Sequence, residues 1–311
     1  MMAAMALQIS VLGRGAWGRT LIGLWERQGH RCRSWSRRDG TPPPPALLEA
    51  DLMVSALAMA GLTSVASQLA PLWPGSLPLL SCSKGLDPER LVTASQLWAA
   101  ELPPGARIAV LSGPNLASEL EQGLPAASVL ASMDQDLSLW LQQQLSGEGL
   151  RLYRNSDPLG AEVAGALKNV MAIAGGICDG LALGANAKAS LLCRGLAEMG
   201  DVITALGGQS STLYGLAGLG DLLATANSSL SRNHRFGQLL ASGLSADQAS
   251  AAIGATVEGR STVQATLNLA VQRGWHLPIC EQVHAVVSGA TSPSAAVKAL
   301  MERQLRAETA P

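Results

Sequence analysis

A glycine pattern near the start of the chain limits what its first part can fold into. Gly13, Gly15 and Gly18 have the spacing G-x-G-x-x-G, directly after the apolar run 8–12 and at the beginning of a helical stretch. In such a unit the first glycine allows a tight turn, the second lets the backbone approach a pyrophosphate, and the third lets the helix pack on the strand. The phosphates then lie at the helix N-terminus. The pattern predicts a dinucleotide site; the alternative is an ordinary glycine-rich turn.

The residues after the second expected strand bear on the choice between NAD and NADP. This strand ends at Trp35, where an NAD-selective protein usually places an acidic residue for the ribose 2′-hydroxyl. The chain has Arg37 and Arg38 there, and their guanidinium groups could pair with a 2′-phosphate, so NADP is favoured over NAD. Two alternatives stay open: the arginines form a solvated charged turn, or Asp39 binds the ribose of NAD.

Apolar runs and helical stretches alternate in the first half of the chain, and helices dominate the second. The expected strands are 7–12, 31–35, 52–56, 77–81 and 108–111. Runs that are apolar throughout are typical of parallel strands buried on both faces. The expected later helices are 159–176, 187–206, 246–253, 260–274, 279–288 and 294–305. We predict an α/β fold: a doubly wound parallel sheet of the Rossmann type over 1–155 and an all-α domain over 156–311.

Composition narrows the class of protein. The 311 residues are 48% hydrophobic, enough for two domains each to bury a core. Lys and Arg number 22 against 23 Asp and Glu, a net charge of −1, and no segment shows the basic clustering of a nucleic-acid binder. The five cysteines form no CxxC pair, so we expect neither a zinc site nor disulfides, which fits a reducing cytosol. No metal is predicted.

Two apolar segments could be mistaken for targeting or membrane sequences. Residues 1–12 carry no Lys or Arg before Arg14, so they lack the basic start of a signal peptide and are interpreted as a leader plus first strand. Residues 52–83 contain no charged side chain, but Pro71, Pro74 and Pro78 interrupt the second half. A buried helix between two buried strands explains this segment better than a membrane span, and we expect a cytoplasmic protein.

A series of short motifs carries a more specific signal than any one of them alone. In chain order they are Ser81–Leu86 (SCSKGL), Leu111–Asn115 (LSGPN), Leu167–Val170 (LKNV), Gly184–Asn186 (GAN), Arg194–Met199 (RGLAEM), Gly218–Leu222 (GLGDL), Ser231–Asn233 (SRN) and Val257–Gly259 (VEG). The ordered set resembles the bacterial glycerol-3-phosphate dehydrogenase family over almost the whole chain.

The resemblance implies an activity and an architecture. The activity would be the NAD(P)-dependent interconversion of sn-glycerol 3-phosphate and dihydroxyacetone phosphate, which supplies glycerol 3-phosphate for phospholipid synthesis. The second domain would be of the 6-phosphogluconate dehydrogenase C-terminal type, with the site between the domains. A homodimer through the helical domain is also implied.

The resemblance also implies which residues form the site. Lys168 would be catalytic, with Asp221 holding its ammonium group. The substrate residues would be Lys84, Gly113, Asn115, Asn169, Thr225, Arg232 and Asn233. The cofactor residues would be Gly13, Gly15, Ala16, Trp17, Gly18, Arg37, Arg38, Lys84, Ala117, Arg232 and Glu258.

The residue types of Lys168 and its expected neighbours suit the reduction of a phosphorylated ketone. Ketone reduction requires a proton on the carbonyl oxygen, and a positioned ammonium can both polarise and protonate that oxygen. Lys168 lies in the apolar stretch 163–174, where a lone lysine needs a partner, unless it is a surface lysine whose stem only crosses apolar surface. Thr225, four positions after Asp221, would share its helix face. Arg232 has the planar fork that fits a phosphate.

The chain departs from the family pattern at two places. The stretch between the second and third strands is shortened to about residues 39–50, so the sheet could lack an element and nucleotide affinity is in question. Asn115 stands where a Thr is common, which keeps a polar contact but changes its donor geometry.

A related dehydrogenase of a β-hydroxy acid or a ketopantoate-like acid would also use Arg232 and Lys84 to bind its substrate. A non-catalytic NADP-binding protein is the other rival, and the joint presence of Lys168, Asp221 and Arg232 argues against it.

Overall fold

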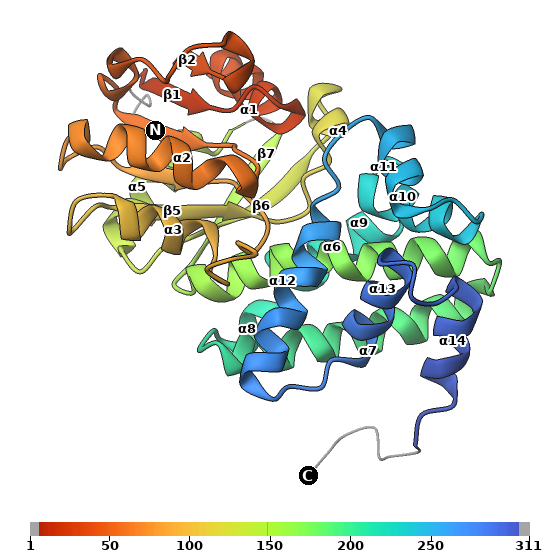
Figure 1. Cartoon of the computed structure of the whole chain (residues 1–311). Coiled ribbons are helices and arrows are strands. Elements are labelled where there is room, and N and C mark those ends of the chain that lie inside the picture. Colours follow the sequence, from red (N-terminus) through yellow and green to blue (C-terminus); the bar gives the residue numbers. More distant parts are fainter. Residues whose placement is uncertain (1–5, 148, 305–311) are drawn as a thin grey trace.

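The computed structural model describes residues 6–147 and 149–304, as a sheet part followed by a helical part (Figure 1). The first five residues of the expected leader and the expected helix end at Leu305 lie outside this description. The strands are β1 (Gln8–Leu12), β2 (Arg31–Trp35), β3 (Leu52–Ser55), β4 (Leu79–Ser81), β5 (Ile108–Ser112), β6 (Ala126–Ala131) and β7 (Leu150–Asn155). The helices of this part are α1 (Ala16–Arg27), α2 (Met59–Leu69), α3 (Ala94–Glu101), α4 (Ala117–Glu121) and α5 (Gln135–Leu145).

The seven strands form one sheet in the order β2-β1-β3-β4-β5-β6-β7. The predicted α/β class is confirmed, with one correction: β6 runs antiparallel to β5, so the sheet is mostly but not entirely parallel. The sequence analysis did not identify β6 and β7. At the sheet edge, β7 alternates buried and exposed residues, so it lacks the continuous apolar run by which the other strands were found.

The connection from β2 to β3 is short. It contains only the 3₁₀ turns η1 (Arg37–Asp39) and η2 (Pro45–Leu48). The chain passes from β2 to the other side of β1, and β2 stays at one edge of the sheet. The prolines at 42–45 lead into η2, where Leu47 and Leu48 are buried.

Two apolar layers, one on each face of the sheet, hold the first part together. On one face, α1 and α5 contribute Leu21, Trp25 and Leu141 to a buried cluster with strand residues. On the other face, α2 and α3 bury Leu62 and Trp98 in a second cluster. The charge-free stretch 52–83 forms β3, α2 and β4 of this arrangement, as predicted.

The helical part is built around one long central helix, α6 (Pro158–Gly180), on which the other helices pack (Figure 1). They are α7 (Gly184–Ala205), α8 (Ser210–Leu213), α9 (Asp221–Ala226), α10 (Arg232–Ala241), α11 (Ala246–Ile253), α12 (Glu258–Arg273), α13 (Pro278–Val287) and α14 (Pro293–Met301), with a π turn, η4 (Leu216–Gly220), before α9. The predicted all-α character is confirmed, and α9 provides the helix face expected for Asp221 and Thr225, whereas α8 and α10 were not foreseen. Of the described helices, α6 alone has the length and apolar composition to cross a membrane, and its most apolar stretch is wholly buried.

Helices α6 and α10 approach each other so closely that side chains are excluded at their crossing. A Cβ on Gly176 would lie 2.0 Å from the carbonyl oxygen of His234, and one on Gly237 would lie 2.1 Å from that of Ile173. The two backbones are therefore in direct contact. This contact fixes the start of α10, with Arg232 and Asn233, relative to the part of α6 that carries Lys168 and Asn169.

Candidate active site

A buried carboxylate, Asp221, joins the sheet part to the helical part. Asp221 begins α9 and is 1% exposed. Its Oδ1 accepts a hydrogen bond from Lys168 Nζ at 2.9 Å, and its Oδ2 accepts one from Lys84 Nζ at 2.6 Å. Lys84 follows β4 and also donates to the carbonyl oxygen of Gly113, after β5, at 3.0 Å. Residues from three separate segments thus meet at one carboxylate.

Lys168 is held inside the helical part. It is 7% exposed, and besides Asp221 it donates to Thr225 Oγ1 at 2.6 Å. The alternative of a surface lysine is therefore wrong. Thr225 shares the helix face of Asp221, as predicted, and donates to Asp221 Oδ1 at 3.1 Å. Burial disfavours the charged ammonium and lowers the pKa of Lys168 to about 8. The positive charge of Lys84 also lowers this pKa, whereas the negative charge of Asp221 raises it.

The charge of Asp221 is maintained despite its burial. Burial alone would raise the pKa of this carboxyl, but the ammonium groups of Lys168 and Lys84 bring it below its ordinary value. The site therefore holds one carboxylate between two cations, with one positive charge in excess. Such an excess favours an anionic ligand.

A second hydrogen-bonded chain continues from Lys168 along α6 to α10 and α12. Asn169 Oδ1 accepts from Asn233 Nδ2 at 2.8 Å, and Asn233 Oδ1 accepts from the backbone N of Gly259 at 2.9 Å. Arg232 and Glu258 are the first residues of α10 and α12. Burial raises the pKa of Glu258, and the positive charge of Arg232 opposes that rise. Arg232 is exposed, so its guanidinium is accessible to a ligand.

The sequence analysis missed the groups that hold α10 in place. His234, 4% exposed, contacts Asp179 Oδ2 through Nε2 at 2.7 Å, and Lys188 donates to the same oxygen at 2.6 Å. Asp179 is near the end of α6, and Lys188 lies in the first turns of α7. This cluster ties three helices together beside Arg232 and Asn233. No motif signalled it, because its members are separated by 9 and 55 residues.

Other buried carboxylates stabilise the surroundings of the site. Glu162 of α6 accepts from the backbone N and Oγ of Ser95, in the first turn of α3, and so links the two parts of the chain a second time. Glu198 of α7 accepts from the backbone N of Ile279 and of Cys280 in the first turn of α13. These carboxylates use the free N–H groups of helix N-termini, a pairing that depends on tertiary structure.

The glycine-rich turn has the geometry that a dinucleotide requires. Gly13 has a φ of +104°, and a Cβ there would lie 2.6 Å from the carbonyl oxygen of Ala56. A Cβ on Gly18 would lie 1.9 Å from the carbonyl oxygen of Gly13, so the third glycine allows the helix to pack closely. Nothing lies within 4 Å of the corresponding point at Gly15, and α1 begins there without a side-chain cap. The open N–H groups of this turn fit a pyrophosphate.

The remaining predicted cofactor residues surround this turn. Ala16 and Trp17 are in the first turn of α1, and Ala117 begins α4, which packs on α1. Arg37 and Arg38 are exposed in η1 after β2. No hydrogen bond in the described part of the chain joins these five residues to Lys168 or Asp221.

Asn115 lies beside the second substrate segment. Its Oδ1 accepts from Ser128 Oγ at 2.6 Å, whereas its Nδ2 is buried without a hydrogen-bond partner in the described chain. Gly113, two residues earlier, has a φ of +134°, and a Cβ there would lie 3.1 Å from Ser128 Cα. The glycine is thus required by close packing, and the amide of Asn115 offers an unused donor.

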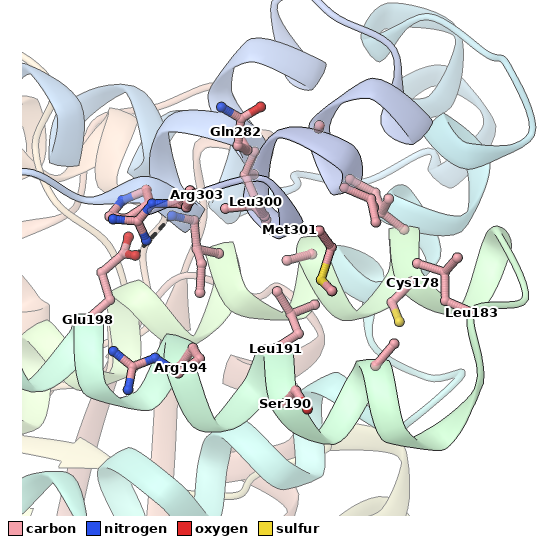
Figure 2. A pocket seen from close by; sticks show the side chains of 18 of the residues that line it. Cys178, Leu183, Ser190, Leu191, Arg194, Glu198, Gln282, Leu300, Met301 and Arg303 are labelled. Atoms are coloured by element: carbon pink, nitrogen blue, oxygen red, sulfur yellow. Dashed lines mark hydrogen bonds between the residues drawn. The ribbon is translucent and has the colours of Figure 1, made fainter. Parts of the chain in front are cut away.

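A cavity in the helical part lies away from Lys168. It has a volume of about 620 Å³ and is bounded by the end of α6 and by α7, α13 and α14. Figure 2 shows Leu183, Leu191, Leu300 and Met301 on its walls, with Arg194 and Glu198 toward one end. Its lining is mostly apolar and contains none of the predicted site residues. Among residues 6–147 and 149–304, no group of three or more His, Cys, Asp or Glu side chains could hold a metal ion.

A glycine-rich turn at the edge of a mostly parallel sheet, a helical second part, and a buried lysine at their junction define a two-domain dehydrogenase of the dinucleotide-binding class. Comparisons with known proteins narrow this class. The family profile for the NAD-dependent glycerol-3-phosphate dehydrogenase N-terminus matches residues 43–138, and the profile for its C-terminus matches residues 157–298. The chain belongs to the NAD-dependent glycerol-3-phosphate dehydrogenase family.

Individual relatives agree with this assignment. A glycerol-3-phosphate dehydrogenase [NAD(P)+] of Synechococcus sp. (strain RCC307) is 57% identical over 304 residues, which cover 98% of this chain and 100% of the relative. The crystal structure of glycerol-3-phosphate dehydrogenase from Coxiella burnetii is 34% identical, with a TM-score of 0.91 over 96% of this chain and 99% of that one. A ketopantoate reductase from Ralstonia eutropha, at 14% identity and a TM-score of 0.55 over 93% of this chain and 99% of that one, shares the fold alone.

The buried charges around Asp221 lead to a prediction on stability. Asp221→Asn removes the counter-charge of two cations that stay buried, so the free energy of unfolding should fall by about 3–5 kcal/mol. Chemical denaturation measures the loss. The matched control is Asp201→Asn, at an exposed position of α7, which should change stability by no more than about 0.5 kcal/mol. Equal losses in the two variants would contradict the proposed balance of charges.

Proposed function

We propose that this protein reduces dihydroxyacetone phosphate to sn-glycerol 3-phosphate, and catalyses the reverse oxidation, with Lys168 as the acid-base group. The observation that carries the proposal is the position of Lys168: a buried ammonium, held by Asp221 and Thr225, at the junction of the two parts. Family membership supports the same substrate pair. The product would serve phospholipid synthesis.

The ammonium of Lys168 has the proton that the reaction needs. Two of its three N–H groups are used by Asp221 and Thr225, and the described chain offers no acceptor for the third. That N–H can bond to the ketone oxygen, polarise the carbonyl group and then transfer its proton as negative charge develops on the oxygen. A pKa of about 8 suits this role, because the group is then protonated at neutral pH and still acidic enough to donate.

When bound, the reduced nicotinamide supplies the hydride to the carbonyl carbon. The chain contributes orientation and charge. Asp221 keeps Lys168 in place and stabilises its ammonium form, so the lysine can recover a proton from solvent after each reduction. In the oxidation of glycerol 3-phosphate, neutral Lys168 accepts the proton of the hydroxyl group instead.

The substrate phosphate would be bound by the cationic groups near the start of α10. Arg232 is exposed there, and its charge acts on both Lys168 and Glu258, so it lies near the site. Asn169, Asn233 and the free amide of Asn115 supply neutral donors. A guanidinium offers two parallel N–H groups to a phosphate, which an ammonium cannot.

The comparisons and the buried lysine weigh against the two rival functions. A carboxylate substrate would also be attracted by Arg232 and Lys84, but the likeness to ketopantoate reductase extends only to the fold. A protein that merely binds the cofactor would have no use for a desolvated lysine paired with a buried carboxylate. For the cofactor, which is NAD or NADP, we propose a preference for NADPH through Arg37 and Arg38.

Replacement of Lys168 by Met tests the catalytic role. The wild-type enzyme should oxidise NADPH with dihydroxyacetone phosphate, followed by the absorbance of the reduced cofactor. Lys168→Met, similar in length but without the charge, should abolish this turnover and leave NADPH binding nearly intact. Because the acid form of Lys168 is required, reduction in the wild type should decline as the pH rises through about 8, whereas oxidation should increase. A variant that keeps more than about a tenth of wild-type kcat rules out Lys168 as the proton donor.

The phosphate contact leads to a prediction for Arg232. Arg232→Lys should lower kcat/KM for dihydroxyacetone phosphate by about one to three orders of magnitude, because binding energy from the remote phosphate positions the carbonyl group. Unphosphorylated dihydroxyacetone should be a poor substrate that is little affected. Arg235→Lys, one turn further along α10 and also exposed, is the matched control. If both substrates lose the same factor, Arg232 serves the cofactor or the fold instead.

We further propose a cytoplasmic homodimer formed through the helical part. The first turns of α7 expose Leu183, Ala185, Ala187 and Ala189, an uncharged surface beside the apolar cavity of Figure 2. Surfaces of this kind commonly mark contacts between subunits. Sedimentation equilibrium should give twice the mass of the chain, and Ala187→Glu should shift the equilibrium toward the monomer. A wild-type protein that sediments as a monomer would contradict the proposal.

A further inference from the structure

An arginine inside the glycine-rich turn reaches the end of the neighbouring strand. Arg14 lies between the first two glycines of the pattern, and its guanidinium donates to Asp39 Oδ1 in an ion pair. The two segments adjoin because the backbone N of Gly13 donates to the carbonyl oxygen of Trp35 at 2.8 Å. The pair therefore lies at the carboxyl ends of β1 and β2, where dinucleotide-binding sheets place the adenosine ribose.

Both carboxylate oxygens of Asp39 are already in use. While Oδ1 accepts from Arg14, Oδ2 accepts from the backbone N of Ser36 at 3.0 Å. Ser36 Oγ in turn accepts from the backbone N of Arg38 at 3.3 Å, which completes a capping box around η1. The carboxylate cannot turn toward a ribose 2′-hydroxyl without giving up these contacts. The possibility that Asp39 selects NAD is thus opposed by its surroundings.

The charge at this corner of the sheet is strongly positive. Arg14 lies in the glycine-rich turn, Arg19 in the first turns of α1, and Arg37 and Arg38 in η1. Arg19 donates to the carbonyl oxygen of Arg14 at 2.9 Å, and Arg37 extends toward α2, where its Cζ lies 3.3 Å from the point that a Cβ on Gly61 would occupy. Arg38 follows in η1. Arg14 is paired with Asp39, but in the described part of the chain Arg19, Arg37 and Arg38 form no ion pair, so three guanidinium charges remain, a setting that suits a doubly charged 2′-phosphate.

We propose that Arg14 is a specificity-determining residue that sets the preference for NADPH over NADH. It acts in two ways: it engages Asp39, so that this carboxylate neither binds the ribose of NADH nor repels a phosphate, and it adds a guanidinium to those of Arg37 and Arg38. The inference rests on the proposed function only in requiring a bound dinucleotide. It assigns the selectivity to the glycine-rich turn as well as to the end of β2.

The test is the binding of both cofactors to the full-length protein without substrate. Fluorescence titration with NADPH and with NADH gives the two dissociation constants of the wild type and of Arg14→Ala. The variant should bind NADPH about tenfold more weakly, because one charge-assisted contact is lost, and should bind NADH more tightly, because Asp39 Oδ1 becomes free. In Arg14→Ala/Asp39→Ala the gain for NADH should disappear and NADPH binding should stay weak.

Arg27→Ala is the matched control, because it removes the same charge from the opposite, exposed end of α1. It should leave both dissociation constants unchanged. Equal weakening of both cofactors by Arg14→Ala, or an unchanged ratio, overturns the inference, as does a gain for NADH that persists in the double variant. Turnover is measured separately: a wild type that binds both cofactors but does not reduce dihydroxyacetone phosphate rejects the proposed function, while the titrations still decide the role of Arg14.

Discussion

The contact on which the rest of the site depends is the bond of one buried carboxylate to two lysines. Asp221 alone could not stay ionised at 1% exposure, and the buried ammonium of Lys168 needs the same counter-charge. Lys84 comes from the sheet part and Lys168 from α6, so the same three charges also bind the two parts to each other. The low pKa of Lys168 follows first from its burial, which outweighs the attraction of Asp221, and it gives the lysine the capacity to exchange a proton near neutral pH. The charges of Asp221, Lys84 and Lys168 thus serve both the contact between the two parts and the chemistry of the site.

Much of this arrangement could be predicted from residue patterns because its causes are local. The glycine spacing specifies the turn at Gly13 through backbone sterics, and continuous apolar runs specify the buried strands. The pairing of Lys168 with Asp221 came from the ordered motifs of a family rather than from spacing, since 53 residues separate the two. The helix α8 escaped because its four residues carry too few turns for a clear period, and α10 escaped because it begins with the polar run RNHR.

What the sequence could not supply are contacts made only by tertiary packing. The carboxylates of Glu162 and Glu198 look like ordinary charged residues in a helix, yet each satisfies the open N–H groups of another helix. His234 follows the substrate motif at once but gave no signal, because its partner Asp179 is brought near only by the crossing of α6 and α10. Likewise, Arg14 occupies a variable position of the glycine pattern, and its ion pair with Asp39 required the observed turn after β2.

The short connection after β2 has a consequence for how copies of this protein meet one another. A sheet edge presents unpaired backbone groups that can recruit the edge of a second molecule and start aggregation. At β2 that edge carries Arg31 and Arg33, both exposed. Alignment of two such strands would bring like charges together. Electrostatic repulsion thus opposes self-association at the edge formed by β2.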